Sequence, residues 1–296
     1  MRVSYVILTC NRRDDLQRCL DSICGQDYPD IEIIVIDNNS NDGTDTLMGQ
    51  YPQAIYLALD YNSGVCQGRN MGFEKASGDI IVVIDDDGEL PQPQVTTDIV
   101  GGFQRLPDMG IMALRVVNPR DPNCRRVIPS KNKDIINSPQ EVPVAYFPGG
   151  GVAIRRTLLD EVGMFPPEYF YSMEELDLAY RVAKTQWQIY YFPQITILHH
   201  ESMAQRPSWR RYYYEYRNRI WLVTSYLPLR YLVVNLSLWG GLTLFRSLRH
   251  GHARPFFRGI ADGVKGHGYF RNRRRQQLLN KEEIRRIKQL QGRLYY

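Results

Sequence analysis

The chain of 296 residues is 43% hydrophobic and 23% charged, which is enough for a sizeable core and matches one α/β domain of about 220 residues with an extension. Its formal net charge of +5 hides an asymmetry, because residues 1–200 hold 17 basic and 27 acidic side chains whereas residues 201–296 hold 20 and 5. The five cysteines are odd in number and lack the paired spacing of metal sites, so we expect reduced thiols.

The opening residues predict a parallel βαβ unit. Residues 2–9 read as a buried strand, and residues 31–36 read as a second one. Between them, apolar residues recur near helical spacing at Leu16, Cys19, Leu20 and Ile23. Short polar connections between such elements are typical of a parallel sheet. Because no signal peptide precedes the first strand, we expect a cytoplasmic protein.

Polar residues follow each predicted strand. Thr9 and Asn11 follow the first strand, and Asp37 and Asn38 follow the second. The next strand, residues 79–84, runs directly into Asp85, Asp86 and Asp87. Ligands of open α/β sheets bind beyond the carboxyl ends of the strands, so all these side chains are expected to face one crevice. In isolation, three aspartates would more commonly be a solvated acidic turn; here they are candidates for a divalent cation, which prefers oxygen ligands.

The second half of the domain adds a loop and an acidic helix. The stretch 118–143 is rich in proline and asparagine, which predicts a long irregular loop or a short hairpin. Glu174, Glu175 and Asp177 open a predicted helix. Acidic residues in a first helical turn commonly just complement the helix dipole, so on their own they indicate no catalysis.

Together these segments resemble the family 2 glycosyltransferases, which use the GT-A fold. The motifs that carry the resemblance are Val-Ile-Leu-Thr-Cys-Asn-Arg at 6–12, Val-Ile-Asp-Asn-Asn-Ser-Asn-Asp-Gly-Thr at 35–44, Asn62-Ser63-Gly64, Gly68-Arg69-Asn70-Met71-Gly72, the aspartate triplet, Pro148-Gly149-Gly150-Gly151, Glu174-Glu175-Leu176-Asp177-Leu178 with Tyr180-Arg181, and His199-His200-Glu201-Ser202. Each motif is weak alone, whereas their order and spacing together are specific.

The resemblance implies an α/β fold of the GT-A type. This is a Rossmann-like, mixed and mainly parallel sheet flanked by helices, here with a C-terminal helical extension. We expect a catalytic domain over residues 1–225, with nucleotide-sugar binding in about residues 1–115 and the acceptor side in about residues 116–225. Residues 226–296 form the expected extension.

The resemblance also suggests a metal site. Sugar transfer from a nucleotide-diphosphate donor releases a diphosphate, whose charge Mn²⁺ or Mg²⁺ neutralises. We expect Asp87 to bind this cation directly, Asp85 directly or through water, and Asp86 to contact the ribose or orient its loop. His199 is expected as a further ligand or a diphosphate contact. His200 is the alternative, because neighbouring strand residues point to opposite faces.

The remaining contacts with the donor are expected from residues at the strand ends and from the motifs at residues 62–64 and 68–72. Asp37 and Asn38 are expected to read the base. Arg69 either approaches the diphosphate, braces the aspartates or forms a structural ion pair. The full set expected to bind the nucleotide sugar is Thr9, Asn11, Asp37, Asn38, Asn62, Arg69 and Asp86. The arginines of Tyr216-Arg217-Asn218-Arg219 are expected to contact anions near the donor or lipid.

The acidic helix is expected to supply the general base. The family pattern there is Glu-Asp-x-Asp or a close variant, and its second acid deprotonates the acceptor hydroxyl. This chain departs from the pattern with Glu175. We favour Glu175 as the base, with Glu174 and Asp177 as alternatives, because the base must lie within hydrogen-bonding distance of the acceptor. Direct displacement by the activated hydroxyl inverts the anomeric centre.

The basic C-terminal region contains an apolar stretch at 226–245, whose uninterrupted part is 231–245. A helix over those 15 residues spans about 22 Å, short of the roughly 30 Å of a bilayer core. We therefore expect shallow insertion into an anionic membrane surface. The arginines expected to reach lipid phosphates are Arg246, Arg249, Arg254 and Arg258. Packing on the catalytic domain or in a homodimer is the alternative, and residues 281–290 predict a charged surface helix.

The sequence thus predicts a metal-dependent inverting glycosyltransferase of the hexosyl- or deoxyhexosyltransferase class. Its expected acceptor is a hydroxyl of a glycan or lipid-linked molecule in surface polysaccharide or glycolipid biosynthesis, at the inner face of the cell membrane. A nucleotidyltransferase is disfavoured because no glycine-rich N-terminal loop with a following basic residue suits a triphosphate. A non-catalytic carbohydrate-binding relative would not need the triplet, the acidic helix and the histidine together. Nucleic acid is not expected, since no recognised nucleic-acid module accompanies the charge.

Overall fold

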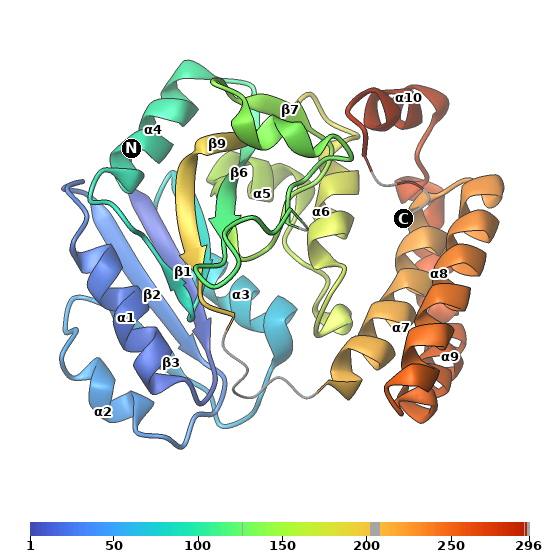
Figure 1. Ribbon diagram of the computed structural model, residues 1–296, viewed down its shortest axis with the longest axis horizontal. Coiled ribbons are helices and arrows are strands. Elements are labelled where there is room, and N and C mark those ends of the chain that lie inside the picture. Colours follow the sequence, from blue (N-terminus) through green and yellow to red (C-terminus); the bar gives the residue numbers. More distant parts are fainter. Residues whose placement is uncertain (126, 202–207, 293, 295–296) are drawn as a thin grey trace.

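The computed structural model describes residues 1–125, 127–201, 208–292 and 294. Within these residues, one nine-stranded sheet runs in the order β3-β2-β1-β4-β8-β6-β9-β5, and β7 pairs with β9 (Figure 1). Strand side chains alternate between two hydrophobic cores. Val6 enters one core, whereas Tyr5 and Ile7 enter the other. Both faces of the sheet are therefore covered, as a mainly parallel sheet requires.

The N-terminal half of the sheet is parallel. Its strands are β1 (Val3–Thr9), β2 (Ile31–Asp37), β3 (Ile55–Ala58) and β4 (Ile80–Asp85). Three of these strands were expected from the sequence, at residues 2–9, 31–36 and 79–84, and β1, β2 and β4 confirm them to within a residue or two at their ends. The register pairs Thr9 with Asp37 and Leu8 with Asp85, so the polar strand ends meet at one edge of the sheet.

The other half of the sheet is mixed. Its strands are β5 (Gly88–Glu89), β6 (Met109–Val117), β7 (Val142–Val144), β8 (Gly151–Arg155) and β9 (Gln188–His199). β8 runs antiparallel to β4 and pairs Gly151 with Ile84, immediately before the aspartate triplet. β9 pairs His199 with Gly88, immediately after it. Two chain segments remote in sequence are thus aligned on either side of the three aspartates.

Helices connect and cover the strands. The helices of the sheet domain are α1 (Arg13–Cys24), α2 (Thr44–Met48), α3 (Gly64–Lys75), α4 (Val95–Arg105), α5 (Arg156–Val162) and α6 (Glu174–Val182), with short 3-10 helices at Lys133–Asn137 and Pro167–Tyr169. The four apolar residues that predicted α1 are all buried under the sheet. The stretch 118–143 is largely irregular, as predicted, although residue 126 lies outside the described residues.

The first three of the four C-terminal helices form a bundle beside the sheet domain, and the last one packs on the sheet domain itself (Figure 1). They are α7 (Trp209–Tyr226), α8 (Leu229–Arg249), α9 (Ala253–Gln277) and α10 (Lys281–Gln289). The predicted last helix is confirmed as α10, whose Ile284 and Ile287 are buried against the domain. At the end of α7, Tyr226 donates a hydrogen bond of 2.9 Å to Asp177 on α6. The division of the chain at residue 225 stays a prediction.

Candidate active site

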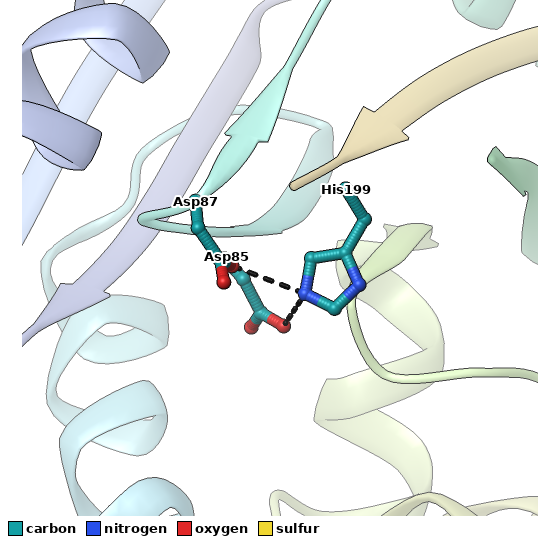
Figure 2. Close-up of side chains that lie close together, drawn as sticks. All are labelled: Asp85, Asp87 and His199. Atoms are coloured by element: carbon teal, nitrogen blue, oxygen red, sulfur yellow. Dashed lines mark ion pairs between the residues drawn. The ribbon is translucent and has the colours of Figure 1, made fainter. Parts of the chain in front are cut away.

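Three side chains from two strand ends converge beside the sheet. Asp85 ends β4, Asp87 follows it, and His199 ends β9 (Figure 2). His199 Nε2 lies 3.0 Å from Asp87 Oδ1 and 3.6 Å from Asp85 Oδ2. One ligand atom from each residue lies within 4.8 Å of the other two. This donor set of two carboxylates and one imidazole fits a divalent cation such as Mn²⁺ or Mg²⁺.

The local backbone explains why this histidine joins the aspartates. Asp87 O accepts a hydrogen bond of 3.0 Å from His200 N, which holds the end of β9 against the triplet. Consecutive residues of a strand point to opposite faces, so His200 turns away from His199. The His200 Nε2 instead lies 2.7 Å from Glu89 Oε2. Of the two expected histidines, only His199 therefore belongs to the cluster.

Two arginines brace the aspartates from either side. Arg12 Nη1 lies 2.8 Å from Asp86 Oδ1 and 3.5 Å from Asp87 Oδ2. Arg69 Nη2 lies 2.8 Å from Asp85 Oδ1. Burial raises the pKa of Asp86 to about 7, and the charge of Arg12 opposes this rise. Of the roles expected for Arg69, the structure shows the bracing of the aspartates.

A cavity of about 390 Å³ opens next to these carboxylates. Of the residues expected from the sequence, it is lined by Thr9, Asn38, Asn62, Arg69, Asp85, Asp86, Glu174 and Glu175. Asn11, Asp37, Asp87, His199 and Asp177 are outside its lining. The cavity thus joins the strand ends to the start of α6, which lies more than 80 residues further along the chain.

The three acids of α6 have different surroundings. Glu175 is half-buried in the cavity wall. Glu174 is buried, with its Oε1 3.5 Å from Arg69 Nη1. Burial and the neighbouring Glu175 raise the pKa of Glu174 to about 8, while Arg69 opposes the rise. Asp177 is fully buried away from the cavity, where Arg181 and Tyr226 each donate to it over 2.9 Å.

Gly149 and Gly150 lie between the acidic helix and the carboxylate of Asp85. A Cβ on Gly149 would overlap the carboxylate of Glu175. A Cβ on Gly150 would lie 2.8 Å from Asp85 Oδ2. Only glycine therefore allows both carboxylates to approach the backbone that separates them.

The donor-side polar residues divide into cavity contacts and loop supports. Asn38 Oδ1 accepts hydrogen bonds from Ser63 N and Oγ, of 3.1 and 2.7 Å. Asp37 accepts from Ser40 N and from Tyr56 OH, and so fixes the turn after β2. Asn11 accepts from Asn41 N and ties the turn after β1 to the same region. Asp37 and Asn11 therefore shape the cavity through the backbone.

Comparison with known proteins agrees with this geometry. Residues 4–163 match the sequence profile of Glycosyl transferase family 2. The chain belongs to this family. It is 25% identical over 264 residues to the glycosyltransferase AglE of Haloferax volcanii, covering 76% of this chain and 81% of that protein. It is also 33% identical over 101 residues to the GalNAc(5)-diNAcBac-PP-undecaprenol beta-1,3-glucosyltransferase of Campylobacter jejuni, covering 32% of this chain and 33% of that protein.

A solved structure supports the fold of this glycosyltransferase. The mannosyltransferase PcManGT of Pyrobaculum calidifontis, in complex with GDP-Man and Mn²⁺, superposes with a TM-score of 0.56 at 20% sequence identity. The superposition covers 93% of this chain and 73% of that one. The glycosyltransferase therefore has the GT-A fold expected from its motifs. Its membership of the family sets aside the nucleotidyltransferase and non-catalytic interpretations.

Several residues at the site had no role assigned from the sequence. Arg12 lies in the motif at residues 6–12, and its place in the turn after β1 was the sequence signal for a role at the site. Arg210 and residues 170–172 also line the cavity of the glycosyltransferase, from segments without a recognisable pattern. Conversely, Arg217 and Arg219 are not in the cavity lining: Arg217 donates to backbone carbonyls of residues 168 and 169, and Arg219 to Asn235 on α8.

Proposed function

We propose that this glycosyltransferase transfers a sugar from a nucleoside-diphosphate donor to a hydroxyl of a glycan or lipid-linked acceptor, with inversion and with a divalent cation. The observation that carries the proposal is the proximity of two groups across Gly149 and Gly150. On one side is the cluster of Asp85, Asp87 and His199, and on the other is Glu175 in the cavity wall. This pairing brings a site for the leaving diphosphate next to a base for the acceptor.

The proposed metal site rests on the cluster's donor atoms. Asp85, Asp87 and His199 would hold the cation. When bound, it supplies positive charge to the diphosphate oxygens. Mn²⁺ suits the mixed oxygen and nitrogen donors, and Mg²⁺ is the alternative. The fold neighbour PcManGT, in complex with GDP-Man and Mn²⁺, supports this assignment.

Glu175 is the proposed general base. A carboxyl with a pKa of about 8, such as Glu174, is mostly protonated at pH 7 and cannot accept a proton. Asp177 is saturated by Arg181 and Tyr226 outside the cavity. In the proposed step, the Glu175 carboxylate takes the acceptor hydroxyl proton, the acceptor oxygen bonds to the anomeric carbon, and the bond from that carbon to the diphosphate oxygen breaks. Attack opposite the leaving group inverts the anomeric centre.

The donor is proposed to occupy the cavity between the strand ends. Thr9, Asn38, Asn62, Arg69 and Asp86 all line it. Among the described residues, the buried Thr9 Oγ1 has no hydrogen-bonding partner, which leaves it available to a ligand. Asp37 and Asn11 are proposed to act on the nucleotide through the turns that they support. The Campylobacter jejuni relative is named for a PP-undecaprenol acceptor, which supports a lipid-linked acceptor here.

The outer surface of α8 supports peripheral attachment to the inner face of an anionic membrane. Within the described residues, no helix is long and apolar enough to span a bilayer. Yet α8 exposes Leu229 (69%), Phe245 (63%) and Leu248 (61%), while its buried residues include Asn235 and Ser247. The hydrophobic effect disfavours this arrangement in water and favours it at a lipid interface. The adjoining arginines proposed to meet lipid phosphates are Arg246, Arg249, Arg254 and Arg258.

The proposed function is tested by a donor screen on the purified protein. Thermal unfolding is measured with UDP-, GDP- and dTDP-sugars, each with and without Mn²⁺. We expect one donor to raise the unfolding temperature, and Mn²⁺ to enlarge that shift. A shift that is identical with Mn²⁺ and with EDTA for every donor would contradict the metal-dependent part of the proposal.

A further inference from the structure

The turn before the acidic helix has an uncommon backbone conformation. Phe170, Ser172 and Met173 have φ angles of 61°, 72° and 77°, although none of them is glycine. Such left-handed conformations cost free energy and persist only where the surroundings hold them. The helix start has no side-chain cap either, because Met173 occupies that position and makes no capping hydrogen bond. The position of α6 and its acids therefore depends on whatever holds this turn.

A buried amide on α7 donates hydrogen bonds to three carbonyls of this turn. Asn218 Nδ2 donates hydrogen bonds to the carbonyl oxygens of Tyr169, Tyr171 and Ser172, over 2.9, 2.8 and 2.8 Å. Asn218 is fully buried. Its Oδ1 accepts a hydrogen bond of 2.9 Å from Arg217 Nε, which fixes the orientation of the amide because a guanidinium can only donate.

The same turn also contacts the donor side of the cavity. Phe170 O accepts a hydrogen bond of 2.6 Å from Val65 N at the start of α3. A Cβ on Gly64 would lie 2.5 Å from the Phe170 ring, so α3 packs closely on the turn. Phe170, Tyr171 and Ser172 line the cavity together with Glu175. A shift of the turn would therefore move the acidic helix relative to the donor.

We propose that Asn218 is a positioning residue that clamps the turn 169–173 and thereby sets the place of Glu175 in the cavity. The inference rests on the proposed function. It adds that a residue on α7 determines where the proposed base lies. Misplacing a reacting group by about 1 Å can cost on the order of a hundredfold in rate. Loss of the clamp should therefore lower kcat while leaving the donor contacts of the strand ends in place.

The test compares Asn218→Ala with a matched control, Asn235→Ala. Asn235 is also a buried asparagine on a C-terminal helix, hydrogen-bonded to Leu294 O and by Arg219, and it is outside the cavity lining. Turnover is measured with a soluble acceptor, well below the unfolding temperatures of both variants. We expect Asn218→Ala to lower kcat by about tenfold to a hundredfold, with the donor dissociation constant changed less than about threefold. Asn235→Ala should lose stability but keep its kcat.

A second measurement does not depend on turnover. Hydrogen exchange of the amides of residues 169–175, in protein without ligand, should speed up in Asn218→Ala and stay as in the wild type in Asn235→Ala. If Asn218→Ala does not fold, Asn218→Ser, which retains one hydroxyl donor, carries the same comparison. Equal kcat in the two asparagine variants, or unchanged exchange of the turn, would overturn the positioning role. A wild-type enzyme that transfers no sugar from any donor would instead contradict the proposed function.

Discussion

Asp87 is the residue on which the proposed metal site depends most. It is fully buried, lies 3.0 Å from His199 and is braced by Arg12. We expect Asp87→Ala to abolish transfer and to remove the Mn²⁺-dependent part of donor binding, because one of two carboxylate ligands is lost. Asp85→Ala should reduce transfer and Mn²⁺-dependent donor binding less than Asp87→Ala does, if Asp85 contacts the cation through a water molecule. Calorimetric titration of the donor with and without Mn²⁺ measures both effects.

His200→Ala is the control for this prediction. His200 adjoins the cluster in sequence but pairs with Glu89, so its loss should leave the Mn²⁺ dependence of donor binding unchanged. Metal-dependent binding that survives in Asp87→Ala, or disappears in His200→Ala, would show that the cation lies elsewhere.

Glu175→Gln tests the assignment of the base. The glutamine amide keeps the size of the side chain but cannot take the proton of the acceptor hydroxyl. We expect kcat to fall by about a hundredfold or more, with donor affinity retained. Steady-state turnover and donor titration separate the two quantities. Near-normal turnover would contradict the assignment of the base to Glu175.

Glu174 should leave a signature in the pH dependence of stability. The pKa of Glu174 is raised from 4.5 to about 8 on folding, so between these values the folded state retains a proton that the unfolded state has lost. The free energy of unfolding should therefore fall as pH rises from about 4.5 to about 8, and Glu174→Gln should reduce this decline. Urea unfolding of both proteins in EDTA at several pH values measures it. Parallel pH profiles for wild type and variant would disprove the raised pKa.

At the scale of elements, the Gly149–Gly150 segment separates the proposed base, Glu175, from the proposed metal ligand Asp85. Gly149→Ala places a methyl group on the Glu175 carboxylate, so we expect kcat to fall at least about tenfold as the base is displaced. Gly241→Ala on α8 is the matched control, because its Cβ would meet nothing within 4 Å. The control should keep full activity and gain about 0.5–1 kcal/mol in the free energy of unfolding. Equal activity of the two variants would refute the spacing argument.

The strands and the first helix could be predicted because their signals are local. Mostly apolar runs mark β1, β2 and β4, and helical spacing marks α1. The short strands β5 and β7 carry no such signal, since two or three residues are too few for a period. Their pairing with β9 is decided by contacts between remote segments. The ends of β1, β2 and β4 could therefore be predicted, because a polar motif follows each of them, whereas β5 and β7 could not.

The site residues show the same limit. Asp85 and Asp87 follow directly from the strand that carries them. The strand period predicts only that one of His199 and His200 faces the site, and the family resemblance favours His199. The surroundings of Glu174 and Asp177 were not predictable, because they depend on Arg69 from α3 and Tyr226 from α7. Asn218 lies in the stretch Tyr216-Arg217-Asn218-Arg219, but its clamp could not be predicted, since it joins α7 to backbone carbonyls almost fifty residues earlier.

At the scale of the whole molecule, the apolar face of α8 should bind anionic lipid. Protein truncated before Tyr226 should lose binding to anionic liposomes, although this change also removes the Tyr226 contact with Asp177. The sharper variant is Leu238→Asn with Phe245→Asn, because both side chains are exposed and their loss leaves the core intact. Full-length binding should weaken as salt rises from about 0.05 to 0.5 M and keep a salt-resistant remainder from apolar insertion. Co-sedimentation measures these effects.

Ile55→Asn, which changes an exposed apolar residue on the edge strand β3, is the control for liposome binding. It should bind liposomes as the wild type does. Absence of binding at every salt concentration, with the α8 face protected in a homodimer, would replace the membrane interpretation with a dimer interface.

The central claim is that the cluster of Asp85, Asp87 and His199 and the carboxylate of Glu175, on either side of Gly149 and Gly150, act together in direct displacement at the anomeric carbon. The most direct test is the anomeric configuration of the first-formed product, read by proton NMR with Mg²⁺ and the donor identified by the screen. The account predicts a product whose new linkage has the opposite configuration to that of the donor sugar. A product that retains the donor's configuration would contradict it.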